Sequence, residues 1–168
     1  MRLAEYLKQW QIVLKNKFFY LALALLFSFP YIYENMKVRI DMTHDVCLPY
    51  TVWITDSDFN ANKQNYFMFV PKKDKYTAKA KYLFKMIGCR PGQELETKGL
   101  DYYCDGKWIS KAKEWDMSGF GKLNQFIFNG VIPENNYFAI ATHPYAYDSK
   151  YFGFVEKKQI VRGAYPVY

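Results

Sequence analysis

The segment Lys81–Gly92, KYLFKMIGCRPG, indicates how this chain folds. Residues 81–88 form a largely apolar run with the length and composition typical of a β-strand. The Arg-Pro-Gly sequence at 90–92 is typical of a turn. The segment therefore predicts a strand that ends abruptly, with one unusual feature, the charged Lys85 in the middle of the run.

Similar short runs lie on both sides of this strand. They cover residues 36–42, 50–55, 66–70, 95–97, 101–104, 107–110, 136–142 and 159–165. The Asp105-Gly106 pair separates two of them and is typical of a tight hairpin turn. Many short strands joined by Gly- and Pro-containing turns predict a mainly β domain, a barrel or a sandwich. Residues 111–128 are more polar, and we expect them to form a surface excursion.

The composition excludes several classes of protein. Hydrophobic residues make up 51% of the 168 residues and charged residues 23%, so the chain can fill a core and is not disordered. Two His and three Cys are too few for a dense metal cluster, and we expect no metal and no cofactor. The net charge of +7 suits nucleic acid or an anionic membrane surface. Because recognition-helix, zinc-finger and arginine-rich patterns are missing from the sequence, we expect no nucleic-acid partner.

An apolar stretch near the N-terminus predicts a membrane anchor. Residues 18–33, FFYLALALLFSFPYIY, carry no charge and reach about 24 Å as a helix, against about 30 Å for a hydrocarbon core. The basic residues before the stretch leave the N-terminus in the cytoplasm by the positive-inside rule. The expected division is 1–17 cytoplasmic, 18–34 a transmembrane signal anchor, and 35–168 a β domain on the other side. A cleaved secretory signal peptide and a buried core helix are the alternatives.

The sequence Cys47-Leu48-Pro49-Tyr50 follows this stretch closely. A cysteine that precedes a Leu-Pro turn near a membrane can be a positioned nucleophile. It can equally be a small buried hydrophobe or half of a disulfide.

Lys85 is the second candidate for chemistry. Strand alternation places it on the face opposite Phe84 and Met86 and alongside Leu83 and Ile87. A buried ammonium is costly, so a lysine in this position tends to lose its proton and act as a base. The alternative is an ordinary lysine that points outward from the strand.

The C-terminal part of the chain contains the third candidate. Residues 148–155 read DSKYFGFV and lie between two predicted strands. Asp148 can pair with Lys150 or accept hydrogen bonds from backbone amides. The alternative is a structural turn with a satisfied carboxylate.

Taken in this order, the three segments resemble the type I signal peptidases, and they look closest to the TraF-like branch that processes pilins in bacterial conjugation. That family has a nucleophilic Ser shortly before a Pro, a lysine base in a K-R-x-x-x-x-P-G-D run, a D-S-R-Y-F-G-x-V motif and a G-R-A-like strand. The matching positions here are Cys47-Leu48-Pro49, Lys85 with Pro91-Gly92, Asp148 to Val155, and Arg162-Gly163-Ala164. Departures from the family pattern are Cys47 for Ser, Met86 for Arg, Gln93 for Asp, Lys150 for Arg and Ala146 near the position of a supporting Ser.

The resemblance implies a role for each residue. Cys47 is expected to be the nucleophile and, through its amide, an oxyanion donor, and Lys85 the base. Supporting residues are expected at Asp148, Ser149 and His143, and a shallow substrate groove at Leu48, Pro49 and Tyr50. The implied protein is a signal peptidase-like endopeptidase of the bacterial inner membrane, with inner membrane lipid around its anchor. Its implied partners are a prepilin or other exported precursor and subunits of the conjugation machinery.

The number of cysteines agrees with this interpretation. Three cysteines in an exported domain suggest one disulfide and one thiol. Cys89 and Cys104, 15 residues apart on neighbouring predicted strands, are expected to close a loop that would contribute roughly 3 kcal/mol. Cys47 would then be left as the thiol. A Cys47–His143 pair competes with the Cys47–Lys85 pair, because His143 lies in the loop expected near the site.

Two functional classes stay open. One is an active peptidase that hydrolyses its precursor or cyclises it. The other keeps the fold, lacks catalysis and acts as a scaffold that binds pilin or other assembly components. The buried setting expected for Lys85 favours the first class, and the loss of the serine favours the second.

Overall fold

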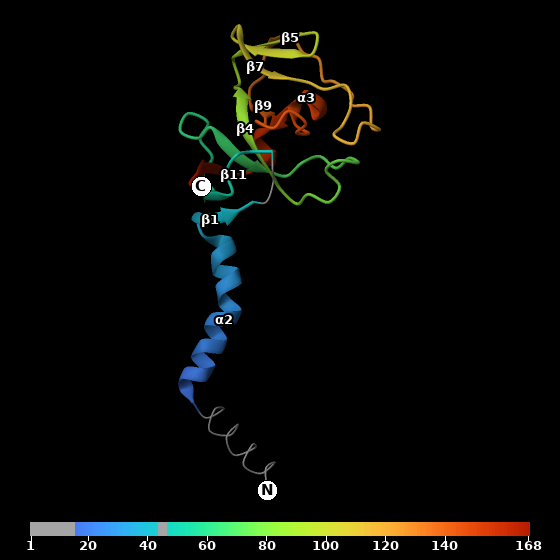
Figure 1. Ribbon diagram of the computed structural model, residues 1–168. Coiled ribbons are helices and arrows are strands. Elements are labelled where there is room, and N and C mark those ends of the chain that lie inside the picture. The colour runs from blue at the N-terminus through green and yellow to red at the C-terminus, as the bar shows by residue number, and fades with distance from the viewer. Residues whose placement is uncertain (1–15, 44–46) are drawn as a thin grey trace. The chain divides into compact units, whose positions relative to one another are not determined.

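The computed structural model describes residues 16–43 and 47–168 (Figure 1). The chain divides into two compact units, Met1–Lys37 and Val38–Tyr168. Among the described residues, the first unit consists of a helix and the second of β-strands with short helical turns.

The first unit contains α2, a helix of 19 residues from Lys17 to Asn35. It begins after Asn16, whose side chain accepts a hydrogen bond from the amide of Phe18 at 3.0 Å and so caps the helix. Pro30 lies inside the helix. Within residues 16–43 and 47–168, no helix combines the length and the apolar character that a membrane crossing requires.

The second unit is built on two antiparallel sheets, as the mainly β prediction requires. The larger sheet has the order β1 (Val38–Met42), β2 (Val52–Asp56), β11 (Ile160–Pro166), β3 (Tyr66–Phe69), β4 (Leu83–Cys89), β9 (Asn136–Ile140) and β10 (Val155–Glu156). The smaller sheet has the order β7 (Lys107–Lys111), β6 (Asp101–Cys104), β5 (Glu94–Lys98) and β8 (Gly130–Val131). In Figure 1, one end of the β domain carries β1 and β11, and the opposite end carries β5 and β7. Strands β4 and β9 run between these two ends.

Four short elements of the structure were not predicted from the sequence. They are β8 and β10, each two residues long, the single-turn helix α3 (Ser149–Phe152) and the 3-10 turn η1 (Lys157–Gln159). Elements this short contain less than one period of any hydrophobic pattern, so tertiary contacts decide where they form. The predicted Asp105-Gly106 turn joins β6 to β7, and both of its residues have positive φ, 48° and 74°.

β4 holds the centre of the domain, because it contributes to each of the three buried clusters. Phe84 packs with Trp53 and other side chains of the first cluster. Ile87 belongs to the second cluster, around Phe67. Cys89 belongs to the third, around residues of the smaller sheet. Each large side chain buried in this way contributes roughly 1.5–3 kcal/mol, so the position of β4 is determined from several directions.

The predicted disulfide is present. Cys89 of β4 and Cys104 of β6 are bonded, with their Cα atoms 5.7 Å apart. The bond joins the larger sheet to the smaller one, and Cys47 takes no part in it.

Replacing both cysteines by alanine is expected to cost roughly 3 kcal/mol of unfolding free energy, because the open chain gains conformational freedom in the unfolded state. Denaturant titration of the oxidised wild type against the double variant measures this difference. A loss well below 1 kcal/mol would contradict a structural role for the disulfide.

Candidate active site

Lys85 lies in the middle of β4 with only 1% of its surface exposed. It stands opposite Phe67 of β3, which is itself fully buried. The expected burial of this lysine is confirmed, and the alternative of an outward-pointing strand lysine is wrong. Retaining an amino group at such a position costs free energy that an apolar side chain would not, which makes Lys85 a candidate for function.

Cys47 is held through its main chain. Its carbonyl oxygen accepts hydrogen bonds from the amides of Thr142 and His143, at 3.1 and 3.2 Å, and from the hydroxyl of Thr142 at 3.2 Å. Its half-buried side chain packs against the first cluster, which includes Phe84 of β4 and Ala141.

The register of β4 and β9 relates these two residues. Met86 pairs with Ile140, the last pair of this ladder, and the residues that come next on the two strands are Lys85 and Ala141. The amide of Ala141 points away from β4, toward Asp148. The next amide, that of Thr142, binds the carbonyl of Cys47. The main chain of Cys47 therefore lies where β4 and β9 stop pairing, next to the segment that carries Lys85.

Asp148 and Ser149 hold the strand that faces Lys85. Asp148 caps helix α3 and accepts hydrogen bonds from the amides of Lys150 and Ala141, at 3.0 and 3.1 Å. The hydroxyl of Ser149 accepts from the amide of Ala139 at 2.8 Å. These contacts satisfy two amides, that of Ala139 in β9 and that of Ala141 just after it. They therefore hold the end of β9 in place.

The expected partner of Asp148 is confirmed as well. Lys150 Nζ lies 2.6 Å from Asp148 Oδ2, and both side chains are almost completely buried. Lys150 Nζ also donates to the hydroxyl of Ser110 on β7, at 3.1 Å, and so links the loop to the smaller sheet. Burial raises the pKa of Asp148, while the charge of Lys150 and, less strongly, that of Lys85 oppose this increase. Lys85 is thus close enough to influence the Asp148 carboxyl electrostatically.

His143 contacts the Cys47 segment through its backbone. Its amide binds the Cys47 carbonyl, and its ring Nδ1 accepts a hydrogen bond from the amide of Tyr145 at 3.3 Å. The ring therefore stabilises the turn of its own loop. Whether it also pairs with the Cys47 thiol stays a prediction.

The three residues expected to form the substrate groove differ in how far they are exposed to solvent. Leu48 is 6% exposed and belongs to the core around Trp53, so its side chain does not line an open groove. Tyr50 is half-buried and packs edge-on against Trp53, with 5.5 Å between ring centroids. Pro49 is exposed. A role of Pro49 and Tyr50 in binding substrate stays a prediction, whereas the Leu48 side chain packs in the core.

A groove of about 470 Å³ is lined in part by the segment that binds the Cys47 carbonyl. Its lining residues are Met86, the β7 residues 108–111, Lys113 and residues 140–144. Thr142 and His143, whose amides bind the Cys47 carbonyl, belong to one wall of this groove. Sequence reasoning missed it, although an exposed Trp108 two residues after the hairpin turn is a usable signal.

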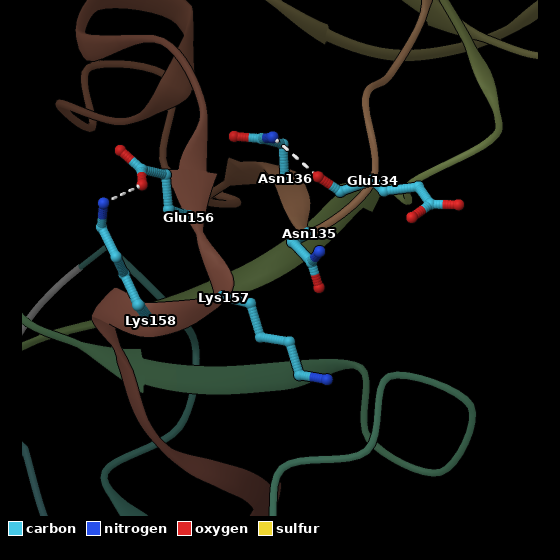
Figure 2. Close-up of a pocket in the computed structure, with 6 residues that line it drawn as sticks. All are labelled: Glu134, Asn135, Asn136, Glu156, Lys157 and Lys158. Atoms are coloured by element: carbon cyan, nitrogen blue, oxygen red, sulfur yellow. Dashed lines mark hydrogen bonds and ion pairs between the residues drawn. The ribbon is translucent and has the colours of Figure 1, made fainter.

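A second hollow lies at the β9–β10 edge of the larger sheet, among polar and charged residues. It measures about 520 Å³ and is lined by Glu134, Asn135, Asn136, Glu156, Lys157 and Lys158. Figure 2 shows the ion pair between Glu156 and Lys158, 2.6 Å long, at its rim. Its lining includes no site residue predicted from the sequence. In the described part of the chain, no three His, Cys, Asp or Glu side chains are grouped so that they could hold a metal ion.

Comparison with known proteins identifies the family to which this arrangement belongs. No curated protein matches the chain. The family model described as "Signal peptidase, peptidase S26" matches residues 10–168. The match spans the β domain and includes Cys47, Lys85 and the Asp148–Lys150 pair. This protein therefore belongs to the signal peptidase family, peptidase S26, which is a family of proteases.

Proposed function

We propose that the chain is a membrane-anchored signal peptidase-like protease in which Cys47 is the nucleophile and Lys85 the general base. The observation that carries the proposal is the burial of Lys85, 1% exposed, in the strand next to the segment that anchors Cys47. Asp148, Ser149 and the amides of β9 keep the facing strand in place. A buried amine beside a nucleophilic side chain is the pairing that general-base catalysis requires.

The proposed reaction proceeds in two steps. In the first, the thiol proton passes to Lys85 Nζ and the Cys47 sulfur attacks the scissile carbonyl carbon. The amide of Cys47 donates a hydrogen bond to the oxyanion. The C–N bond then breaks as Lys85 returns the proton to the leaving amine, and a thioester is left on Cys47. In the second step, water or an amine loses a proton to Lys85 and attacks the thioester carbonyl, the C–S bond breaks, and the Cys47 sulfur takes the proton back, which releases a hydrolysed or a cyclised product and restores the thiol.

The proposed substrate is a prepilin of a conjugative transfer system or another exported precursor. The likeness of residues 148–155 to the motif of the pilin-processing branch supports this choice. The charge-free stretch 18–33 and the basic residues before it support an anchor in the bacterial inner membrane and a periplasmic catalytic domain. Subunits of the conjugation machinery are the expected neighbours.

A test of this topology uses reporters fused after Tyr168. A reporter that is active only after export is expected to be active there, and a reporter that works only in the cytoplasm is expected to be silent. The control fuses the same two reporters after Lys15. There the cytoplasmic reporter is expected to be active and the export-dependent reporter silent. Cytoplasmic activity at the C-terminus would overturn the proposed orientation.

A specific observation favours a second candidate, an inactive scaffold that binds pilin. Ala146, buried at 2% exposure in the cluster that contains Cys47, offers no hydroxyl to support a lysine base. In this alternative, the S26 fold presents a groove to a partner and no bond is broken.

Co-expression with a candidate prepilin separates the two candidates. The intact mass of the pilin is measured in cells that carry the wild type, Cys47→Ala or Glu156→Ala, the last as a control far from the site in the chain. The protease proposal expects a shortened pilin with the wild type and the control, and an unprocessed pilin with Cys47→Ala. A pilin that keeps its full mass in all three cases but co-purifies with the chain supports the scaffold.

A further inference from the structure

The groove next to the Cys47 segment is lined by apolar side chains and by two lysines. Its apolar lining comes from Met86, Trp108, Ile109 and Ile140, among others. The charged side chains that line it, among the described residues, are Lys111 and Lys113, and no carboxylate does so. A largely apolar peptide with one acidic side chain therefore complements its lining in polarity and in charge.

The two lysines differ in how far their charge is compensated. Lys111 Nζ lies 3.4 Å from Asp101, and Asp101 also accepts a hydrogen bond from the Trp108 ring nitrogen at 3.0 Å. One carboxylate thus fixes both Trp108 and Lys111 at the rim. In residues 16–43 and 47–168, by contrast, Lys113 has no carboxylate within ion-pair distance.

Lys113 is also held in place. Its amide donates a hydrogen bond to the hydroxyl of Tyr151 at 2.8 Å. Because Tyr151 belongs to helix α3, this bond ties the backbone of Lys113 to that helix. Its ammonium lies 5.4 Å from the centre of the Tyr145 ring, in the loop that includes His143. A half-buried, positioned ammonium without a carboxylate partner is suited to bind a carboxylate supplied by a ligand.

β7 provides a way for a peptide to lie in this groove. It is the outermost strand of the smaller sheet, so one of its edges faces no other strand of that sheet among the described residues. Extended peptides bind such edges through main-chain hydrogen bonds, and side-chain pockets then select the sequence. The same groove is lined by residues 108–111 of β7 and by Thr142 and His143, which bind the Cys47 carbonyl.

We propose that Lys113 is a specificity-determining residue that selects peptide substrates with an acidic side chain, which it binds in the groove between β7 and residues 140–144. This inference rests on the proposed function, because it assigns the groove to the substrate of Cys47. Lys111 contributes less, since Asp101 already compensates its charge.

Binding of labelled peptides tests this proposal without requiring cleavage. Full-length Cys47→Ala protein in detergent is titrated into nonapeptides composed of apolar residues, in which a single Glu occupies each position in turn. Each peptide has a partner with Gln at the same position and the same label. We expect Glu to be preferred over Gln about fivefold to tenfold at one or two adjacent positions, and the preference to shrink as salt is raised.

Two variants, each made in the Cys47→Ala protein, identify the residue responsible. Lys113→Glu is expected to remove the preference for Glu and to favour a Lys-containing peptide at the same position. Lys107→Glu makes the same charge change at the start of β7, outside the groove lining, and is expected to leave the preference unchanged. Equal binding of all Glu and Gln partners, or an unchanged preference in Lys113→Glu, overturns the proposal.

The same peptides distinguish this inference from the proposed function. If wild-type protein binds the Glu peptides preferentially but cleaves no precursor, the protease proposal fails and the selection of acidic peptides stands. If wild-type protein cleaves a precursor and shows no preference for Glu at any position, the protease proposal stands and the role of Lys113 is refuted.

Discussion

Lys85→Met is expected to lower the rate of precursor processing by about 10²–10⁴-fold, the contribution typical of a general base. Methionine preserves most of the length and the apolar stem of lysine, so the variant still fills its place in β4. The amino group of Lys85 is enclosed, since the residue is 1% exposed. Replacing it by an apolar side chain of similar length is therefore expected to leave the fold intact.

The measurement combines two readouts. Processing is followed as the fraction of precursor at its cleaved mass over time, and stability is followed by denaturant titration of the same preparation. Lys122→Met provides a control with the same chemical change in the segment 111–128, which is largely exposed. Processing by Lys85→Met at the wild-type rate would exclude Lys85 as the base and leave His143 as the next candidate.

Asp148→Ala is expected to have the largest effect on stability, about 3–5 kcal/mol of unfolding free energy. The change removes one partner of a buried ion pair, which leaves the Lys150 ammonium uncompensated in the core. It also leaves the amides of Ala141 and Lys150 without their acceptor. Denaturant titration at neutral pH measures the loss.

The chain contains a matched control for this prediction. Glu156 and Lys158 form an ion pair of the same length, 2.6 Å, but Lys158 is exposed and Glu156 partly so. Glu156→Ala is expected to cost less than about 1 kcal/mol, because solvent screens surface pairs. Similar losses for the two variants would show that burial of Asp148 and Lys150 does not determine the cost.

A further variant separates two contributions of Asp148 to stability, its negative charge and its hydrogen bonds to backbone amides. Asp148→Asn keeps an oxygen that can accept from backbone amides but removes the negative charge. It is expected to recover part of the loss seen with alanine and no more, because Lys150 still lacks its counter-charge.

Much of the β domain could be predicted from local pattern. Run 83–89 is apolar except for Lys85 and Gly88, and run 136–140 is apolar after Asn136, which is enough to indicate a strand. The Asp105-Gly106 turn was predictable because its two positive φ angles suit only a few residue types. The Cys89–Cys104 bond followed from the number of cysteines and from neighbouring strands.

The groove could not be predicted in the same way. Its two walls come from β7 and from the segment after β9, which are about thirty residues apart in the chain and meet only through tertiary contacts such as that between Lys150 and Ser110. The sequence near Cys47 pointed instead to Leu48, whose side chain the fold directs into the core. Local pattern identifies which residues carry chemistry more readily than which surface a ligand meets.

The position of β4 in three buried clusters has a consequence for how this protein can change. Substitutions at Phe84, Ile87 or Cys89 disturb different parts of the core, yet each moves the backbone that carries Lys85. The same side chains therefore determine both the position of Lys85 and the free energy of unfolding. In a mutational scan, we expect substitutions at these side chains to reduce activity and stability together. New substrate preferences are more accessible through β7 and residues 111–128, where the backbone of β4 stays undisturbed.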